Sequence, residues 1–109
     1  MRIVRTKGFD RDLKRIGATK VDLDALIADL VANPEAGDRI VGLSGVRKVR
    51  FALPSRKIGK SGGGRAIYLL IVKVDTIILV LAFAKNEQSD LSPRQRQQVL
   101  AFLEELDRG

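Results

Sequence analysis

The apolar residues of the first third of the chain recur at helical intervals. Phe9, Leu13 and Ile16 are three or four positions apart, and the same spacing continues through residues 19–33. Thr19 and Asp22 stand as a capping box at the start of that second segment, and a proline follows its end. This pattern predicts two helices joined at a glycine, after a short strand at residues 3–4.

From Val46 the period changes to two. Val49 and Phe51 would face one side of a strand, whereas Lys48 and Arg50 would face the other. This alternation is typical of a half-buried strand, because one face packs against the core and the other is exposed to solvent. We therefore expect a strand over 46–52 that presents two cations on the same open face.

Two further runs, 65–73 and 76–84, are rich in Ile, Leu and Val and are separated by "KVDT", which predicts a central β-hairpin. Ser92, Pro93 and Gln95 then stand as N-cap, first helical residue and capping-box partner of a last helix. The expected fold is α+β: a small antiparallel sheet with an N-terminal helical hairpin and a C-terminal helix. With 109 residues, we expect one domain over 1–109, with one sheet face covered and the other open.

Composition narrows the available chemistry. The chain has no cysteine and no histidine, so disulfides, thiolate metal sites and the common zinc sites are excluded, and we expect no cofactor. The apolar span 66–84 carries Lys73 and Asp75 at its middle, which argues against a membrane helix. No apolar run of signal-peptide length follows the basic N-terminus, so we expect a cytoplasmic protein.

Positive charge is concentrated in the middle of the sequence. The net charge is +7, and residues 46–65, "VRKVRFALPSRKIGKSGGGR", hold seven basic residues and no acidic ones. Such a segment suits a polyanion, because cations that contact phosphates release counterions. A solvated basic loop explains the charge equally well at this point.

The glycine-rich part of that segment, "GKSGGG", resembles the end of a nucleotide-binding phosphate loop. That interpretation fails because Pro54 stands where the motif needs its first glycine and because a strand follows instead of a helix. We expect instead a mobile loop between two strands. The predicted RNA-binding residues of this region are Arg47, Arg56, Lys57 and Lys60.

Four segments carry a family resemblance: "NPEAGD" (33–38), "GVRKVRFA" (45–52), "GKSGGGRAIY" (59–68) and "AKNEQSDLS" (84–92). In order and spacing they resemble the RelE/HigB-type toxins of bacterial type II toxin-antitoxin systems, over about two thirds of the chain. The resemblance implies an mRNA interferase that cuts message in the ribosomal A site. It also implies a cognate antitoxin, in this subgroup usually a helix-turn-helix DNA-binding protein.

The resemblance also implies catalytic residues. Lys48 and Arg50 fall on the basic strand that lines the family's cleft, Arg65 falls where the family places an arginine against the scissile phosphate, and Lys85 falls near another basic position. Some relatives carry a tyrosine near the start of the last helix, where this chain has Ser92. RNA supplies its own 2′-hydroxyl nucleophile, so a metal-independent enzyme needs to align it, move protons and stabilise the added charge.

Two alternatives stay open on the sequence. A toxin of the related ParE type would poison DNA gyrase and cut no RNA. A non-enzymatic basic module would bind RNA with salt-dependent affinity and leave message intact. Tyr68 is expected to be a buried aromatic rather than a platform for a base, and Glu87 and Asp90 either orient the cations or simply precede the last helix.

Overall fold

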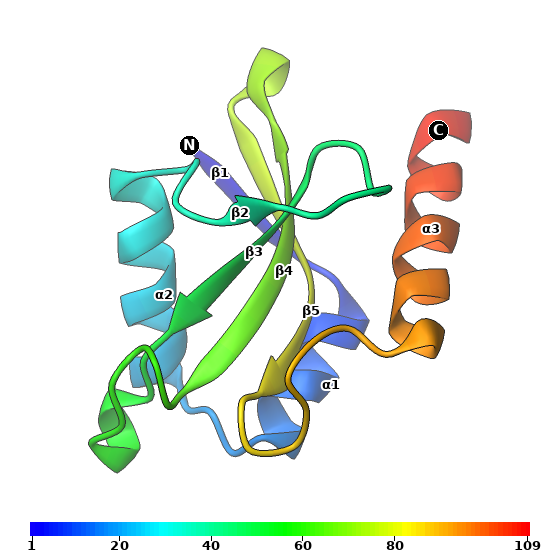
Figure 1. The fold of residues 1–109 in the computed structure, drawn as a ribbon. Coiled ribbons are helices and arrows are strands. Elements are labelled where there is room, and N and C mark those ends of the chain that lie inside the picture. The colour runs from blue at the N-terminus through cyan, green and yellow to red at the C-terminus, as the bar shows by residue number, and fades with distance from the viewer.

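The computed structural model describes all 109 residues and contains one five-stranded sheet and three α-helices (Figure 1). The sheet order is β1-β5-β4-β3-β2. The strands are β1 (Arg2–Arg5), β2 (Asp38–Arg39), β3 (Val46–Phe51), β4 (Gly64–Ile71) and β5 (Thr76–Ala84). The helices are α1 (Lys7–Arg15), α2 (Lys20–Ala32) and α3 (Pro93–Arg108), with short 3-10 turns η1 (Pro54–Arg56) and η2 (Val72–Val74).

The helix boundaries follow the capping residues in the sequence. Thr6 caps α1 by accepting a hydrogen bond from the Phe9 N–H at 3.0 Å. Both predicted capping boxes are confirmed, with the box of α2 at residues 19 and 22 and that of α3 at residues 92 and 95. Each box satisfies two backbone donors that a helix start would otherwise leave unpaired.

The sheet contains the three predicted antiparallel strands and two features that the sequence pattern did not predict. Strand β1 runs parallel to β5, with Ile3 opposite Ile77. The connection between them contains α1, α2 and the strands β2, β3 and β4, which is long enough for the crossover that parallel pairing requires. The short edge strand β2 pairs with β3 although its two residues, Asp38 and Arg39, carry no apolar signal. The sheet is therefore mixed rather than wholly antiparallel.

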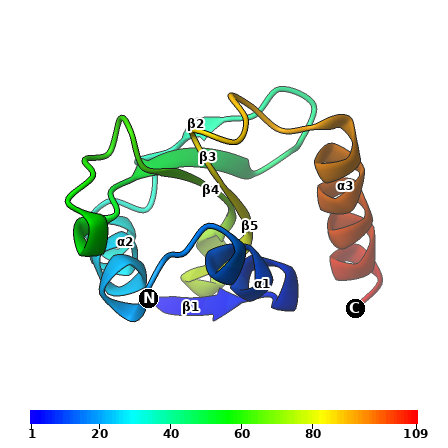
Figure 2. The ribbon, with the colours of Figure 1, turned by 90° about the horizontal axis from the view of Figure 1, so that it is seen from below.

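The two sheet faces are covered differently. Figure 2 shows α2 and α3 on opposite sides of the sheet. The face under α1 and α2 holds the larger buried cluster, which includes Phe9, Leu30, Phe51 and Tyr68. The face near α3 holds a second cluster in which Val99 is the only fully buried residue of that helix.

The apolar span 66–84 is the central hairpin of β4 and β5, as expected. Its turn is η2, and Asp75 closes it in the left-handed conformation with φ 49°. Lys73 lies in this turn, at the end of the hairpin, where its charge meets solvent. None of the helices has the length and apolar content needed to cross a membrane.

Candidate active site

Three of the four predicted catalytic cations share one face of the sheet. Arg50 of β3 is the cross-strand partner of Arg65 of β4, and Lys48 is the partner of Ile67. Ile67 belongs to the cluster beneath α3, so this is the face opposite α1 and α2. The period-two pattern of β3 therefore places its cations as the sequence predicted.

Arg65 is the most buried of these cations, with 8% of its surface exposed. Its Nη1 donates to the carbonyls of Gly64 at 3.0 Å and Lys60 at 3.4 Å, and its Nη2 donates to that of Ser61 at 3.3 Å. Burial lowers the pKa of Arg65, and the positive charge of Arg50 lowers it further. The guanidinium thus fastens the glycine-rich loop, which joins β3 to β4 and includes η1, to the sheet.

Lys48 is held by a carboxylate from the segment before α3. Its Nζ lies 3.1 Å from Oδ1 of Asp90, although 42 residues separate the two in sequence. The pKa of Asp90 is lowered, first by the hydrogen bond from the Leu91 N–H and then by that from Lys48. Of the two roles left open for Asp90, this contact favours orientation of a cleft cation.

Lys85 follows directly after β5, at the same end of the sheet. Its backbone N–H donates to the carbonyl of Gly63 at 2.9 Å, so it adjoins the loop that Arg65 fastens. The neighbouring β5 residue Phe83 is the cross-strand partner of Arg65. The Lys85 side chain is exposed and makes no ion pair. Lys48, Arg50 and Arg65 therefore share one face of β3 and β4, and Lys85 follows the end of the adjacent strand β5.

The residues predicted to bind RNA do not gather with these cations. Arg47 points to the opposite face, where its Nη1 donates to the carbonyl of Gly37 at 2.8 Å. Lys60 forms an ion pair with Asp29 of α2, with 3.2 Å between Nζ and Oδ2. Arg47 therefore joins β3 to the segment before β2, and Lys60 joins the loop to α2.

The other two predicted RNA-binding residues lie on the start of the loop. The guanidinium of Arg56 lies over Gly17, where an added Cβ would be 1.9 Å from Nη2. Lys57 is exposed and has a positive φ of 59°. Contact of any of the four with RNA stays a prediction.

The glycine-rich loop has more internal structure than its composition suggested. Its first part, η1, is anchored by Asp22, which accepts hydrogen bonds from the Ser55 N–H at 2.9 Å and the Ser55 hydroxyl at 2.6 Å. A Cβ on Gly63 would lie 2.2 Å from the Phe51 carbonyl oxygen, whereas one on Gly59 would meet nothing within 4 Å. Gly63 is thus required by close packing, and Gly59 is not.

Sequence reasoning found Asp22 as a helix cap but missed its second role. The carboxylate is buried and has no cationic partner. Burial acts to raise its pKa, but hydrogen bonds from Ser55 and Thr19 lower it below the ordinary value. The side chain therefore joins the start of α2 to the start of the loop, a contact that no local sequence pattern indicated.

Comparison with known proteins identifies the family. A family model described as "RelE toxin of RelE / RelB toxin-antitoxin system" matches residues 1–107. The chain belongs to the RelE toxin family. The match extends the expected resemblance, which began at residue 33, to the N-terminal strand and both first helices. In this RelE-family chain Lys48, Arg50 and Arg65 lie on the sheet face opposite those two helices.

Solved structures share the fold of this RelE-family protein. A mutant of Escherichia coli toxin RelE in the free state aligns with TM-score 0.57 and 13% identity, covering 92% of this chain and 94% of that one. The isolated E. coli RelE toxin aligns with TM-score 0.56 and 14% identity, covering 93% and 97%. A conserved hypothetical protein of Helicobacter pylori aligns with TM-score 0.54 and 20% identity, covering 80% and 97%. At these identities the likeness concerns the fold, and it confirms the α+β prediction.

Proposed function

We propose that this RelE-family toxin is a ribosome-dependent mRNA interferase, a metal-independent endoribonuclease that cuts message in the ribosomal A site and so inhibits translation in the cytoplasm. The observation that carries the proposal is the pairing of Arg50 with Arg65 on one sheet face, with Lys48 on the same face and Lys85 at the adjoining strand end. Three cations on one sheet face, with a fourth at the adjoining strand end, suit a phosphodiester and its developing negative charge.

The chemistry assigns a role to each cation. The 2′-hydroxyl of the message loses its proton to solvent water as its oxygen attacks the adjacent phosphorus, the bond from phosphorus to the 5′-oxygen breaks, and a 2′,3′-cyclic phosphate remains. Arg50 and Arg65 stabilise the charge on the phosphoryl oxygens, since guanidinium groups hold such oxygens in a fixed geometry. Lys85, which has no ion-pair partner, donates a proton to the departing 5′-oxygen.

Lys48 and the ribosome supply alignment. The contact between Lys48 and Asp90 fixes the lysine beside Arg50, where it binds the message next to the scissile phosphate. Alignment of reacting groups is worth as much as ~10⁵–10⁸ M in effective concentration, so the ribosome compensates for the absence of histidine in the cleft. We therefore expect cleavage on programmed ribosomes and negligible cleavage of free RNA.

The toxin would be silenced by a cognate antitoxin, as the family name implies. We propose that this antitoxin is of RelB type in its role and that its DNA-binding part is a helix-turn-helix module. Coexpression of the neighbouring reading frame, followed by a growth assay, tests this pairing. Rescue of growth supports it, and continued arrest despite a soluble complex contradicts it.

The decisive experiment uses the purified protein with ribosomes that hold one defined message. We expect cleavage of the RNA message and none when the nucleotide before the scissile phosphate is 2′-deoxy, because the nucleophile is then missing. The upstream product should end in a 2′,3′-cyclic phosphate. Cleavage of the deoxy message at the parent rate would rule out the proposed chemistry.

The role of Lys85 has its own test. Lys85→Ala should lower the cleavage rate by about 10²- to 10⁴-fold, which is the usual contribution of general acid–base catalysis. A message with sulfur in place of the bridging 5′-oxygen has a leaving group that needs no proton, so it should restore most of the rate. The matched control is Lys73→Ala in the β4–β5 turn, which removes the same charge at the opposite end of the hairpin and should cleave normally.

The same assays separate the alternative functions. A ParE-like toxin would leave the message intact and cause gyrase-linked DNA breaks in cells. A non-enzymatic binding module would bind ribosomes or RNA with an affinity that falls as salt concentration rises, and it would cause no loss of message. Either result would replace the interferase proposal.

A further inference from the structure

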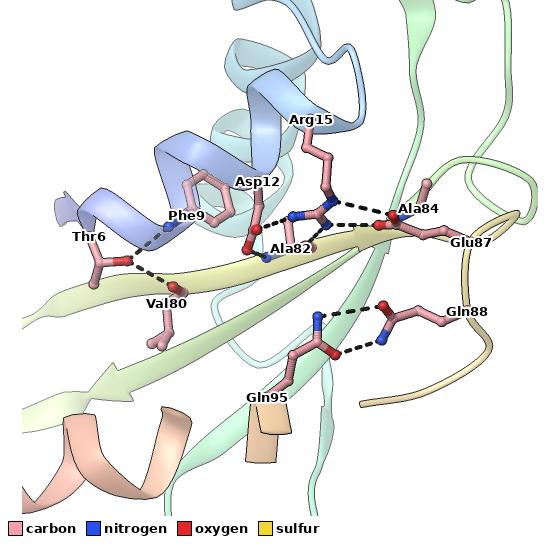
Figure 3. A network of polar contacts seen from close by, with 10 residues as sticks. All are labelled: Thr6, Phe9, Asp12, Arg15, Val80, Ala82, Ala84, Glu87, Gln88 and Gln95. Carbon is pink, nitrogen blue, oxygen red and sulfur yellow. Dashed lines mark hydrogen bonds and ion pairs between the residues drawn. The ribbon is translucent and has the colours of Figure 1, made fainter. Parts of the chain in front are cut away.

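The free edge of β5 is completed by side chains rather than by a strand. Strand β1 pairs with β5 only as far as Leu79. Beyond that point the carbonyl of Val80 accepts from Thr6 Oγ1 at 2.7 Å, and the N–H of Ala82 donates to Asp12 Oδ2 at 3.0 Å. Figure 3 shows these side chains reaching β5 from the start and the body of α1. Helix α1 thus satisfies the backbone groups that an additional strand would have paired.

Arg15, in the last turn of α1, connects this edge to the segment after β5. Its Nη2 donates to the carbonyl of Ala82 at 3.1 Å and to Oε1 of Glu87 at 2.8 Å, and its Nε donates to Oε2 of Glu87 at 3.2 Å. Arg15 also pairs with Asp12. The hydrogen bond to Glu87 is the main reason that the pKa of Arg15 is raised, and the reciprocal bond lowers the pKa of Glu87. The two-point contact fixes both position and orientation of the Glu87 carboxylate.

Glu87 in turn fixes the short turn that contains Lys85. Its Oε1 accepts the N–H of Ala84 at 2.9 Å, and its own N–H donates to the carbonyl of Ala84 at 3.1 Å. Between these two residues, the N–H of Lys85 bonds to Gly63. The next residue, Gln88, donates from Nε2 to Oε1 of Gln95 at 2.6 Å, which ties the segment to α3 (Figure 3). Lys85 therefore lies inside a turn held from both sides.

We propose that Arg15 is a positioning residue for RNA cleavage, acting through Glu87 to hold the Lys85 turn against the glycine-rich loop; this rests on the proposed interferase function. Arg15 lies in α1, distant in sequence from the predicted catalytic cations. The sequence pattern therefore did not group it with them. The three residues Arg15, Glu87 and Gly63 also line one small pocket, which places the ion pair directly beside the loop.

A purely structural role predicts a different magnitude. The side chains of Arg15 and Glu87 are 44% and 33% exposed, and ion pairs with such exposure contribute little to the stability of the fold. A displacement of ~1 Å in an active group, by contrast, costs as much as ~10²-fold in rate. Loss of the pair should therefore change the rate of cleavage much more than the stability of the protein.

The test measures single-turnover cleavage on programmed ribosomes as a function of toxin concentration, with thermal unfolding of each variant. Arg15→Gln and Glu87→Gln should each lower the maximal rate by about 10- to 100-fold. The concentration giving half the maximal rate should stay within about twofold of the parent value, because positioning affects chemistry and not ribosome binding. The double variant should be no slower than the slower single one, because both substitutions remove the same contact.

The control is Arg11→Gln, which removes an exposed charge from the same helix and makes no contact with Glu87. It should match the parent in rate and unfolding temperature. Arg15→Lys keeps the positive charge but lacks the planar guanidinium group. Its maximal cleavage rate should lie between those of the parent and Arg15→Gln.

Three outcomes separate the two proposals. Parent-like maximal rates for Arg15→Gln and Glu87→Gln overturn the positioning role and leave the interferase function standing. A loss in rate that is matched by loss of folded protein in Glu87→Gln, the nearly isosteric change, overturns it as well. A parent protein that cuts no message on any ribosome overturns the interferase function itself, and the positioning role with it.

Discussion

The two faces of the sheet differ in what their side chains do. Under α1 and α2 the strands contribute large buried groups such as Phe51 and Tyr68, and even the polar atoms are satisfied internally. On the other face Lys48 and Arg50 share the sheet with a smaller buried cluster, to which α3 contributes Val99. Burial of apolar surface on both faces stabilises the fold, and the larger cluster lies under α1 and α2. The proposed chemistry therefore belongs to the face with the smaller cluster.

The largest effect should come from the covered face. Phe9→Ala, at a fully buried position of α1, should lower the free energy of unfolding by about 3–5 kcal/mol. The matched change on the other face is Phe102→Ala in α3, where the ring is only half-buried and the loss should be about 1–2 kcal/mol. Urea denaturation measures both. Equal losses at the two positions would show that the faces do not differ as described.

Two glycines of the glycine-rich loop test how closely this loop packs against the sheet. Gly63→Ala forces a Cβ against the Phe51 carbonyl and should cost about 1–3 kcal/mol by overpacking. It should also slow cleavage, because Gly63 accepts the hydrogen bond from Lys85. Gly59→Ala in the same loop meets no atom within 4 Å and should leave the unfolding free energy within about 1 kcal/mol of the parent value. A destabilised Gly59→Ala would contradict the packing argument.

Tyr68 tests whether the covered face has a part in the chemistry. Its hydroxyl accepts the Gly37 N–H at 3.0 Å and donates to the Pro34 carbonyl at 2.8 Å, with the ring fully buried. Tyr68→Phe leaves both groups unpaired and should cost about 1–3 kcal/mol in unfolding experiments. The cleavage rate of the folded variant should equal that of the parent. A slowed rate at unchanged stability would move Tyr68 into the active site.

Acid should weaken the covered face through Asp22. Because its pKa is lowered in the folded protein, its contribution is fully present above the unfolded value of about 3.9 and is lost as pH falls through the folded value. The free energy of unfolding of the parent should therefore fall below about pH 4. Asp22→Asn should be less stable at pH 7 and should decline less over the same range. Parallel pH profiles for the two proteins would exclude this carboxylate as a source of acid sensitivity.

The smallest change in stability should come from an exposed cation on the face near α3. Arg50→Gln removes an exposed charge beside Arg65 and should leave the unfolding free energy within about 0.5 kcal/mol of the parent value. Its cleavage rate on ribosomes should nevertheless fall by about 10²- to 10³-fold, since a donor to the developing charge is lost. A stable, fully active Arg50→Gln would remove this residue from the proposed mechanism.

Elements with strong local signals were predicted well. Strand β3, the β4–β5 hairpin, α2 and α3 all lie where apolar spacing and capping residues placed them, within a residue or two. The two cations of β3 share a face because side-chain alternation in a strand is a local property. Tyr68 is buried, as expected for an aromatic residue within an apolar strand.

Contacts between distant segments were not predictable from these signals. The parallel pairing of β1, the edge strand β2 and the extra residue in β5 near Val80 depend on which segments the folded chain brings side by side. Arg47 and Lys60 look like further cations of the basic segment, yet Gly37 and Asp29 on the covered side engage them. The amino-acid sequence shows how many cations the segment contains, but it does not show which groups they contact in the folded protein.

The sequence by itself determined the order of helices and strands, the alternation of faces and the absence of histidine and cysteine, because these follow from composition and from contacts within a few residues. Only the tertiary structure decided that Lys48 meets Asp90, that Arg65 fastens the glycine-rich loop, and that Arg15 reaches Glu87 across 72 positions. Such pairings depend on how the chain packs in three dimensions, because packing brings together side chains that are distant in sequence and share no local pattern.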